Sequence, residues 1–351
     1  MPTPTTELSR HERFHLTVRG EETDRPPIWI MRQAGRYMPE YRALRSQYGF
    51  RDFCLNPEVA AAATLLPMQI LDIDLFIIFN DILIPLEAMG LEVEFPEGGP
   101  RIKAPIRTVA DLERFHAARF SNPVVAESIR LVSERSRRAA PILGFCGAPF
   151  TLAAYAVEGR MSKDQAEIRR MMAEQPALLH EILERLAETA ANYLIAQVAD
   201  GGADGVQVFE SWGSILPMPH DYDTFGTQYQ RRVIERFKAA CPGVPVILYV
   251  RGSSGKITAM EATGADILGV DQYTSLSDAR RQTSRCLQGN LDPIHMVVPG
   301  STEAAVARML EGFDWRRGWI ANLGHGITPD GTVEAAKTFV RCIKRLARNG
   351  A

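Results

Sequence analysis

The sequence lacks the short motifs by which many enzymes are recognised. It contains no GxSxG nucleophile elbow, no Walker-type lysine loop, no GxGxxG turn opening a βαβ unit and no HExxH helix. Its seven histidines show no metal-type spacing with the cysteines or acids. We therefore expect no nucleotide, flavin, pyridoxal or metal cofactor.

Cysteine is also scarce, and no stretch is long and apolar enough to cross a membrane. The five cysteines lie far apart, form no CxxC pair and are odd in number. This argues for reduced thiols and against a disulfide framework or a cysteine-rich zinc site. The uncharged run Val59–Leu71 is too short to span a bilayer and contains Pro67, and residues 1–22 lack the apolar core of a signal peptide. We expect a cytoplasmic protein without a membrane segment.

A strong net charge is absent as well. The 351 residues carry a formal charge of −2, which gives no general attraction to nucleic acid or to an anionic membrane. The apolar content of 46% and charged content of 23% are typical of a globular protein with a large core. We expect one domain over residues 1–351, with residues 1–6 disordered, and any strongly anionic ligand must be bound by a local cluster of cations.

One such cluster follows the apolar run Ile28–Met31. Between Met31 and Arg51 the chain has five arginines, no lysine and a single acid, Glu40. The guanidinium group is planar and always charged, and it binds carboxylates or phosphates with two parallel hydrogen bonds. The segment is therefore either an anion-binding loop or an ordinary solvent-exposed basic loop.

Short β-branched or aromatic runs alternate with helical patterns along the chain. The predicted strands are Ile28–Met31, Leu75–Phe79, Ile142–Phe145, Gly205–Phe209, Val244–Val250, Ile267–Val270, Cys286–Gln288 and Trp319–Leu323. The predicted helices are Glu7–Val18, Pro57–Leu71, Asn122–Arg138, Pro176–Ala199, Pro219–Ala240, Ser254–Thr263, Ser277–Arg285, Thr302–Glu311 and Asp330–Arg348.

Eight strand–helix units predict an α/β fold with parallel strands and right-handed crossovers. We expect a single (β/α)8 TIM barrel with its active-site cleft at the C-terminal ends of the strands. An open doubly wound sheet is the alternative. The Pro- and Gly-rich stretch Leu91–Arg107 predicts a hairpin-like insertion after the second strand.

Asp81 is the most unusual of the polar residues that follow the predicted strands. It lies in the sequence Leu75–Ile84, where nearly all of its neighbours are apolar. Burial of a carboxylate costs free energy unless donors or a cation contact it. Asp81 therefore either caps a turn or pairs with a loop arginine, or it faces a pocket and accepts hydrogen bonds from a ligand.

Three further polar residues lie just beyond predicted strands. Tyr155 is one helical turn beyond Thr151, so its phenol either reaches a pocket mouth or packs in the core. Ser211 follows a strand and either contacts a ligand or caps a helix. His325 lies between Gly324 and Gly326, which favours a functional position over a core position.

The sequence resembles the uroporphyrinogen decarboxylase family over essentially its whole length. The residues that carry the resemblance are PIWIMRQAGRYMPEYRALR at Pro27–Arg45, GFCGAPFTLAAYAVEG at Gly144–Gly159, FNDIL at Phe79–Leu83, VFESW at Val208–Trp212, GNLDP at Gly289–Pro293 and NLGHGI at Asn322–Ile327. The resemblance implies a (β/α)8 barrel, a homodimer and a reaction without metal or organic cofactor. It implies conversion of uroporphyrinogen III to coproporphyrinogen III with loss of four acetate carboxyls as CO₂.

The resemblance also implies the site residues. Those carried over as substrate-binding are Arg32, Gln33, Ala34, Gly35, Arg36, Asp81, Tyr155, Ser211 and His325, and we expect Asp81, Arg32, Arg36 and Tyr155 to take part in catalysis. Two other functions are weighed against this one. A zinc-dependent corrinoid or thiol methyltransferase shares the barrel but needs a His-x-Cys pair, which the chain lacks, and a non-catalytic tetrapyrrole carrier would need the arginines alone.

Overall fold

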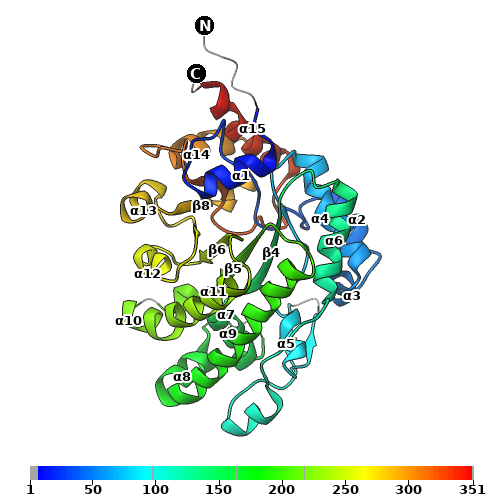
Figure 1. The fold of residues 1–351 in the computed structure, drawn as a ribbon, viewed down its shortest axis with the longest axis vertical. Helices are drawn as coiled ribbons and strands as arrows, with labels where there is room; N and C mark the ends of the chain where they lie inside the picture. The colour runs from blue at the N-terminus through cyan, green and yellow to red at the C-terminus, as the bar shows by residue number, and fades with distance from the viewer. Residues whose placement is uncertain (1–6, 97–98, 161, 163, 217, 350–351) are drawn as a thin grey trace.

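The computed structural model describes residues 7–349 apart from 97–98, 161, 163 and 217, so the disorder expected for residues 1–6 lies outside the described residues. Its centre is a curled parallel sheet (Figure 1). The strands, in spatial order, are β1 (Phe76–Ile77), β4 (Ile142–Gly147), β5 (Gly205–Glu210), β6 (Val246–Val250), β7 (Ile267–Val270), β8 (Cys286–Leu291) and β9 (Trp319–Leu323).

Each strand pairs in parallel with the strands that come before and after it in this sheet. The spatial order is therefore the chain order. A doubly wound sheet reverses its strand order at a switch point, and this sheet has no such reversal among the described residues. The predicted α/β class with parallel pairing is confirmed, and the doubly wound alternative is wrong.

The segment Ile28–Met31 differs from the prediction, because it is not a regular strand. Only Ile28 pairs with β9, through a single parallel bridge to Ala321. Backbone N–H groups that would extend a ladder are bound by side chains instead: Ile30 N–H donates to Gln33 Oε1 (3.1 Å) and Met31 N–H donates to Asn322 Oδ1 (2.8 Å). On its other side, the Ile28 carbonyl accepts from the Asp74 N–H (2.7 Å).

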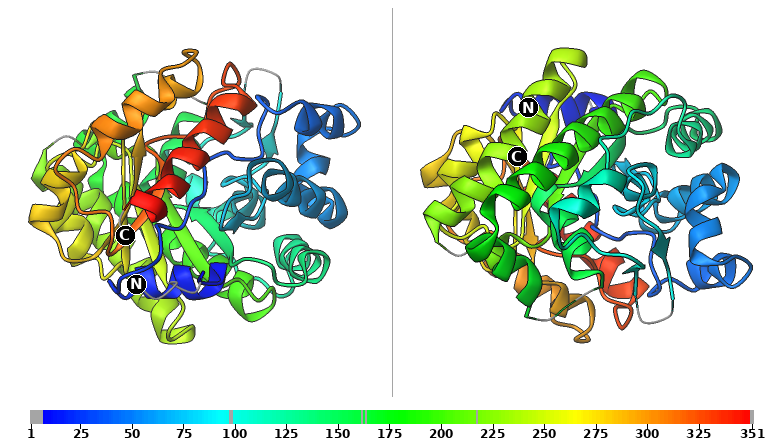
Figure 2. Two further views of the ribbon diagram at one scale, coloured as in Figure 1. Left: turned by 90° about the horizontal axis from the view of Figure 1, so that it is seen from above. Right: turned by 90° about the horizontal axis from the view of Figure 1, so that it is seen from below.

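The helices surround the sheet, and most of them cover its outer side (Figure 2). They are α1 (Arg10–Val18), α2 (Pro39–Arg45), α3 (Phe50–Leu55), α4 (Pro57–Leu71), α5 (Ile84–Ala88), α6 (Val124–Ser136), α7 (Pro149–Glu158), α8 (Ala166–Glu174), α9 (Pro176–Ala199), α10 (Pro219–Tyr222), α11 (Gln228–Ala240), α12 (Ile257–Ala262), α13 (Leu276–Gln282), α14 (Thr302–Met309) and α15 (Val333–Asn349). Short 3₁₀ turns lie at η1 (Val109–Arg114), η2 (Gly213–Ile215) and η4 (Pro293–Met296).

Two helices, α4 and α9, have the predicted bounds. The predicted helix Pro219–Ala240 is interrupted by a π-helical turn, η3 (Asp223–Thr227), between α10 and α11. The predicted insertion is confirmed as a hairpin in which β2 (Val93–Glu94) pairs antiparallel with β3 (Arg101–Ile102). None of the helices in the described part of the chain combines the length and the apolar composition needed to cross a bilayer.

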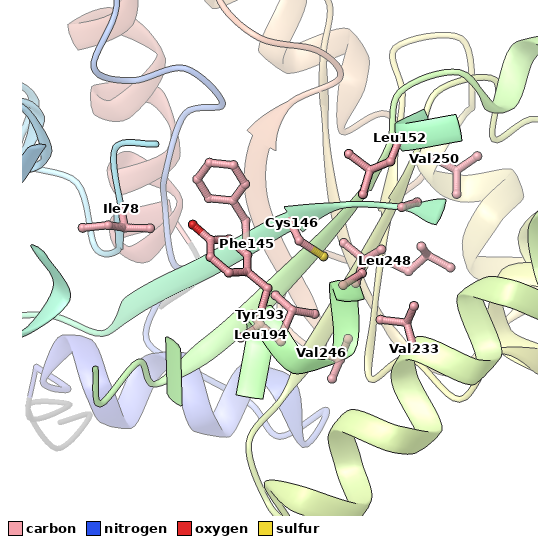
Figure 3. Close-up of a cluster of buried hydrophobic side chains, with 14 of the residues drawn as sticks. Ile78, Phe145, Cys146, Leu152, Tyr193, Leu194, Val233, Val246, Leu248 and Val250 are labelled. Atoms are coloured by element: carbon pink, nitrogen blue, oxygen red, sulfur yellow. The ribbon is translucent and has the colours of Figure 1, made fainter. Parts of the chain in front are cut away.

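The two faces of the sheet have separate apolar clusters, because side chains of a strand alternate in direction. On β6, Ile247 and Tyr249 belong to an inner cluster with Phe14 of α1. The neighbouring β6 side chains Val246, Leu248 and Val250 belong to the outer cluster, which packs against the helices (Figure 3). The inner face of the sheet is thus lined with large side chains, and α1 contributes a fully buried phenylalanine to it.

A buried ion-pair network supports the segment that leads into the arginine-rich loop. Asp74 is fully buried and pairs with Arg13 of α1 (3.1 Å) and with Arg25 (2.5 Å). The same carboxylate accepts the Ile28 N–H (2.9 Å). Removal of one member of such a network leaves an uncompensated buried charge, at a cost of about 3–5 kcal/mol. The network therefore fixes the start of residues 28–31 relative to β1.

Candidate active site

A cavity of about 320 Å³ lies at the C-terminal ends of the strands. This position agrees with the cleft predicted for a parallel barrel. Its polar lining residues are Arg32, Gln33, Asn80, Asp81, Tyr155, Ser211, Tyr249 and His325. Its apolar lining residues are Trp29, Met31, Ala34, Ile77, Ile78, Phe79, Ile82, Leu83, Pro100, Phe145 and Phe209.

The structure brings together most of the site residues predicted from the sequence. Arg32, Gln33, Ala34, Asp81, Tyr155, Ser211 and His325 all line the cavity, whereas Gly35 and Arg36 are outside its described lining. Arg36 is exposed, and its carbonyl accepts a hydrogen bond from the Arg42 guanidinium (2.7 Å). The arginine-rich loop is therefore divided, with Arg32 at the cavity and the later arginines further out.

Arg32 has an unusual backbone and a close neighbour. Its φ is +64°, in the left-handed region that non-glycine residues rarely adopt. Its side chain passes directly over Gly326, where a Cβ atom would lie only 2.4 Å from Arg32 Cδ. The Ile327 N–H donates to the Met31 carbonyl (3.0 Å) and links the two loops. The absence of a side chain at residue 326 therefore makes room for the arginine.

The side chain of Gln33 is engaged within the protein. Its Oε1 accepts the Ile30 N–H (3.1 Å), and its Nε2 donates to the Leu75 carbonyl (3.2 Å). Gln33 is buried, and its own carbonyl accepts the Tyr37 hydroxyl (2.8 Å). This amide holds the loop against the chain just before β1, a role that the sequence did not indicate.

Asp81 is half-buried, and its side chain both caps a turn and faces the cavity, which are the two arrangements considered from the sequence. Its Oδ1 accepts the Leu83 N–H (2.9 Å), as in a capped turn. Among the described residues, no hydrogen bond or ion pair reaches its other oxygen. Burial raises the pKa of the Asp81 carboxyl, while the Leu83 N–H and the positive charge of Arg32 act in the opposite direction. One carboxylate oxygen is thus left to interact with a ligand in the cavity.

Asn80 fixes the peptide that carries Asp81. The Asn80 Oδ1 accepts the Asp81 N–H (2.9 Å), and its Nδ2 donates to the Tyr193 hydroxyl of α9 (2.5 Å). Tyr193 is buried against the edge-on ring of Phe120. A long helix on the outside of the sheet therefore supports the position of the cavity carboxylate.

Tyr155 and Ser211 enter the cavity from adjacent elements. Tyr155 is half-buried on α7, and burial together with the nearby Asp81 raises the pKa of its phenol. Ser211 directly follows β5, and its N–H donates to Thr151 Oγ1 in the first turn of α7 (2.8 Å). The two side chains are therefore positioned through one shared contact between the end of β5 and α7.

His325 lies after β9, between two glycines that allow close packing. The Gly324 carbonyl accepts the Tyr249 hydroxyl (2.9 Å), which anchors this loop to β6. Burial lowers the pKa of His325 to about 4, and the positive charges of Arg32 and Arg251 act in the same direction. The imidazole is therefore neutral at physiological pH, and it can donate one hydrogen bond and accept another.

We expect the His325 ring to remain neutral from pH 8 down to about pH 5. Nuclear magnetic resonance of ring-labelled protein would follow its titration, with His325→Gln to assign the signal. The unfolded chain binds a proton at this ring below the usual pKa of 6.5, whereas the folded protein binds it only near pH 4. The contribution of His325 to the free energy of unfolding is therefore lost as pH falls from about 6.5 toward 4. A midpoint near 6.5 in the folded protein would contradict this.

Three aromatic side chains form the inner wall of the cavity, and sequence reasoning did not single them out. Phe145 of β4 meets Phe209 of β5 edge to face, with ring centroids 5.5 Å apart. Phe209 meets Tyr249 of β6 in the same way, at 5.8 Å. Strands buried on both faces are apolar throughout, so their sequence does not distinguish inward from outward residues. The cavity thus has an aromatic wall in addition to its charged groups.

Within the described residues, no three or more His, Cys, Asp and Glu side chains are grouped so that they could hold a metal ion.

Comparison with solved structures finds the same fold in distant proteins. A methyltransferase from Methanosarcina mazei superposes with a TM-score of 0.75 at 19% identity, over 97% of this chain and 99% of that one. A B12-independent methionine synthase from Shewanella sp. W3-18-1 gives a TM-score of 0.59 at 9% identity, over 86% and 91%.

Comparison with protein sequences gives a much closer match. Uroporphyrinogen decarboxylase of Myxococcus xanthus (strain DK1622) is 41% identical over 342 residues, 95% of this chain and 96% of the relative. That of Pelobacter propionicus (strain DSM 2379) is 40% identical over 342 residues, 96% and 99% of the two chains. The family model described as uroporphyrinogen decarboxylase (URO-D) matches residues 9–346. This chain therefore belongs to the uroporphyrinogen decarboxylase family.

Proposed function

We propose that this protein is a carboxy-lyase that removes the four acetate carboxyls of uroporphyrinogen III as CO₂ and yields coproporphyrinogen III in tetrapyrrole biosynthesis. The observation that carries the proposal is that one cavity contains both the cationic Arg32 and the Asp81 carboxylate, one oxygen of which has no hydrogen-bond partner among the described residues. Relatives named uroporphyrinogen decarboxylase are about 40% identical to this chain over nearly its whole length.

Loss of CO₂ from an acetate side chain requires an acceptor for the electron pair of the breaking bond. The pyrrole ring can serve as that acceptor, because a proton added at the ring carbon next to nitrogen gives an iminium-like cation. The electrons of the broken bond flow into this cation and leave an exocyclic methylene group on the ring. A second proton then completes the methyl group, and loss of the proton first added to the ring carbon restores the pyrrole. The substrate itself supplies the electron sink, so the proposed reaction requires no organic cofactor or metal.

Asp81 is the group that we propose to stabilise the developing cation. Its unengaged oxygen can accept hydrogen bonds from the pyrrole N–H groups, and its negative charge lies where the ring becomes positive. A fixed electrostatic partner in a cavity with few waters commonly contributes about 3 kcal/mol to a transition state. The apolar wall formed by Phe145 and Phe209 favours this arrangement, because it lowers the local dielectric constant.

The other cavity residues receive binding roles in this proposal. Arg32 anchors the reacting acetate through paired hydrogen bonds, and Tyr155 and neutral His325 supply further polar contacts. Ser211, Gln33, Ala34 and Gly35 complete the walls. Arg36 is proposed to bind an outlying carboxylate at the rim, since it is exposed next to the loop that carries Arg32.

The finer points of the architecture are also proposals. We propose that Ile28–Met31 takes the eighth place of a closed (β/α)8 barrel, which is supported by backbone hydrogen bonds from Trp29 to Ala321 (3.2 Å) and from Asp74 to Ile28 (2.7 Å). We further propose one barrel domain over the chain, a homodimer and a cytoplasmic location. Sedimentation of the purified protein at several concentrations would test the homodimer.

The proposed function is tested by incubating purified protein with uroporphyrinogen III and measuring both CO₂ and coproporphyrinogen III. Stoichiometric release of four CO₂ per product is the expected result, and it should be unaffected by chelators. A protein that binds the substrate without releasing CO₂ would be a carrier. A protein that contains tightly bound zinc and transfers methyl groups would be a methyltransferase. Either outcome would overturn the proposal.

Arg36→Lys tests the outer arginine. The substitution keeps the charge and removes the paired hydrogen bonds, so we expect KM for uroporphyrinogen to rise about tenfold with little change in kcat. The control is Arg51→Lys, because Arg51 is exposed and paired with Glu87 (3.1 Å) away from the cavity lining. Unchanged KM and kcat in Arg36→Lys would contradict a binding role for Arg36.

A further inference from the structure

We infer that Glu210 is a positioning residue for this reaction: through Thr151, its carboxylate fixes both the turn that carries Ser211 and the helix that carries Tyr155. The expected effect of Glu210 on kcat rests on the proposed function. Glu210 is the last residue of β5 and does not line the cavity, so it does not contact the substrate. It acts from behind the cavity wall.

Glu210 lies in a fully buried cluster of hydrogen-bonding side chains. Thr151 Oγ1 donates to Glu210 Oε1 (2.5 Å), and Gln230 Nε2 of α11 donates to Oε2 (3.2 Å). All three side chains have no exposed surface. Burial of a carboxylate costs free energy even when it accepts two hydrogen bonds. Stabilisation of the fold alone therefore does not explain a glutamate at this position.

The direction of every hydrogen bond in this cluster is determined. The single hydroxyl proton of Thr151 is used toward Glu210, so the Thr151 oxygen accepts the backbone N–H groups of Ser211 (2.8 Å) and Trp212 (3.3 Å). On the other side, Gln230 Oε1 accepts the Tyr222 hydroxyl (3.0 Å), which turns its amide NH₂ toward Glu210. Both carboxylate oxygens therefore face donors, and the charged form is the one that satisfies the cluster.

The cluster joins two cavity residues to a common support. Thr151 is in the first turn of α7, and Tyr155 follows four residues later on the same face of that helix. Ser211 is held through its N–H by the same hydroxyl. A protonated Glu210 has an O–H group on one oxygen, so it no longer accepts from both Thr151 and Gln230. When the contact with Thr151 is weakened, the Thr151 side chain is less firmly held, and the positions of both Ser211 and Tyr155 are less well fixed. Small displacements of this kind lower kcat by about 10- to 100-fold.

The geometry makes this support sensitive to pH near neutrality. Burial raises the pKa of Glu210 to about 7, although the donors Thr151, Gln230 and Trp212 N–H lower it. Among the described residues, the titratable groups near this cluster include the Tyr222 phenol of α10, on which the Asp223 carboxylate also acts. The Lys256 ammonium lies over the Tyr222 ring, 5.4 Å from its centroid. His325 titrates well below this range. Loss of activity on acidification through pH 7 is therefore expected to report Glu210, and Glu210→Gln separates this loss from any contribution of Asp81, whose pKa is also raised by burial.

Thr151 variants test the geometry of the support. Thr151→Ser keeps the hydroxyl and should retain wild-type kcat, whereas Thr151→Val keeps the shape, loses the hydroxyl and should lower kcat about 10- to 100-fold. Circular dichroism and thermal unfolding would establish that both variants fold. If Thr151→Val folds and retains wild-type kcat, or if Thr151→Ser loses as much activity as Thr151→Val, the inference is wrong.

Glu210→Gln tests the charge. The amide presents one acceptor and one donor, so it cannot accept from both Thr151 and Gln230. We expect kcat at pH 8 to fall about 10- to 100-fold, and the wild-type loss of activity below pH 7 to disappear. Because the folded pKa lies above the usual 4.5, the charged form is disfavoured by folding, and stability falls as pH rises from about 4.5 to 7. Glu210→Gln should therefore unfold at no lower temperature than wild type at pH 8.

The fluorescence of Trp212 can report on this cluster without substrate, because the backbone N–H of Trp212 donates to Thr151 Oγ1. We expect wild-type tryptophan fluorescence to change with a midpoint near pH 7, and the change to be absent in Glu210→Gln and in Trp212→Phe. If the transition is present but wild type releases no CO₂, the proposed function fails and the support survives. Wild-type fluorescence that is flat from pH 6 to 8, or a destabilised Glu210→Gln with an unaltered pH profile, would overturn the inference.

Discussion

Asp81→Asn is expected to lower kcat for uroporphyrinogen about 100- to 1,000-fold while the protein stays folded. Asparagine keeps the size of the side chain and the Oδ1 acceptor for the Leu83 N–H, so the turn after β1 is preserved. It removes the negative charge that we propose to stabilise the protonated pyrrole. The loss should appear mainly in kcat, because the cation develops only during the reaction.

The chain offers a matched control for this substitution. Asp314 makes the same local contact, with its Oδ1 accepting the N–H two residues later (3.1 Å), but it is exposed and outside the cavity lining. Asp314→Asn should leave kcat and KM unchanged. Thermal unfolding of both variants would separate folding from catalysis. Near-normal turnover by folded Asp81→Asn would sink the role proposed for this carboxylate.

Gly326→Ala is expected to reduce kcat/KM about 100-fold, although residue 326 contributes no functional group. The added Cβ would lie 2.4 Å from Arg32 Cδ and 2.7 Å from Cγ, so the arginine side chain must leave its place. Its backbone has little freedom to adjust, because φ at Arg32 is already +64° and the neighbouring Met31 carbonyl is bound by the Ile327 N–H (3.0 Å). The variant would therefore lose the anchor that we propose for the reacting acetate.

Measurement of kcat/KM for Gly326→Ala, Arg32→Ala and the double variant tests this account. If the alanine acts only by displacing Arg32, the double variant should be no worse than Arg32→Ala alone, a strongly non-additive result. Gly49→Ala is the control, because Gly49 is exposed and its added Cβ meets only the Asp52 carboxylate at 3.3 Å. Wild-type kinetics in Gly326→Ala, or full additivity, would contradict the account.

The sequence predicted the parallel sheet well, because its strands and helices carry strong local signals. The bounds of β7 and β9 agree with the predicted strands, and α4 and α9 start at prolines that fix the first helical turn. The exception was Ile28–Met31, where side chains replace the expected backbone ladder. Such replacement depends on residues as distant as Asn322, which local patterns do not reveal.

The short helices between residues 39 and 55 were also missed. Both α2 and α3 have fewer than eight residues and so present at most two turns of periodicity. They lie within the arginine-rich segment, where the unusual composition drew attention to charge rather than to helical spacing. Short helices of this kind are formed by tertiary packing more than by intrinsic propensity.

The positions expected for Asp81 and His325 agree with the structure, which places both in the lining of the cavity, whereas their roles in binding and catalysis stay predictions. The prediction of site residues was incomplete where the function of a side chain depends on its direction. Gln33 was expected to contact substrate, yet both ends of its amide bind the backbone. Glu210 received no role, although it ends a buried strand much as Asp81 follows one. The signal available in the sequence was an acid directly after the apolar run Gly205–Phe209, and the structure shows that this acid is fully buried.

The side-chain hydrogen bonds of Ile28–Met31 have a consequence for local motion. Amide protons in the β4–β5 and β5–β6 ladders exchange with solvent only when strands separate, whereas those of Ile30 and Met31 are released when Gln33 or Asn322 rotates. The Arg32 loop can thus detach from its anchors while the sheet stays intact. In deuterium exchange, these two amides should exchange faster than those of β5 and slow down when ligand fills the cavity.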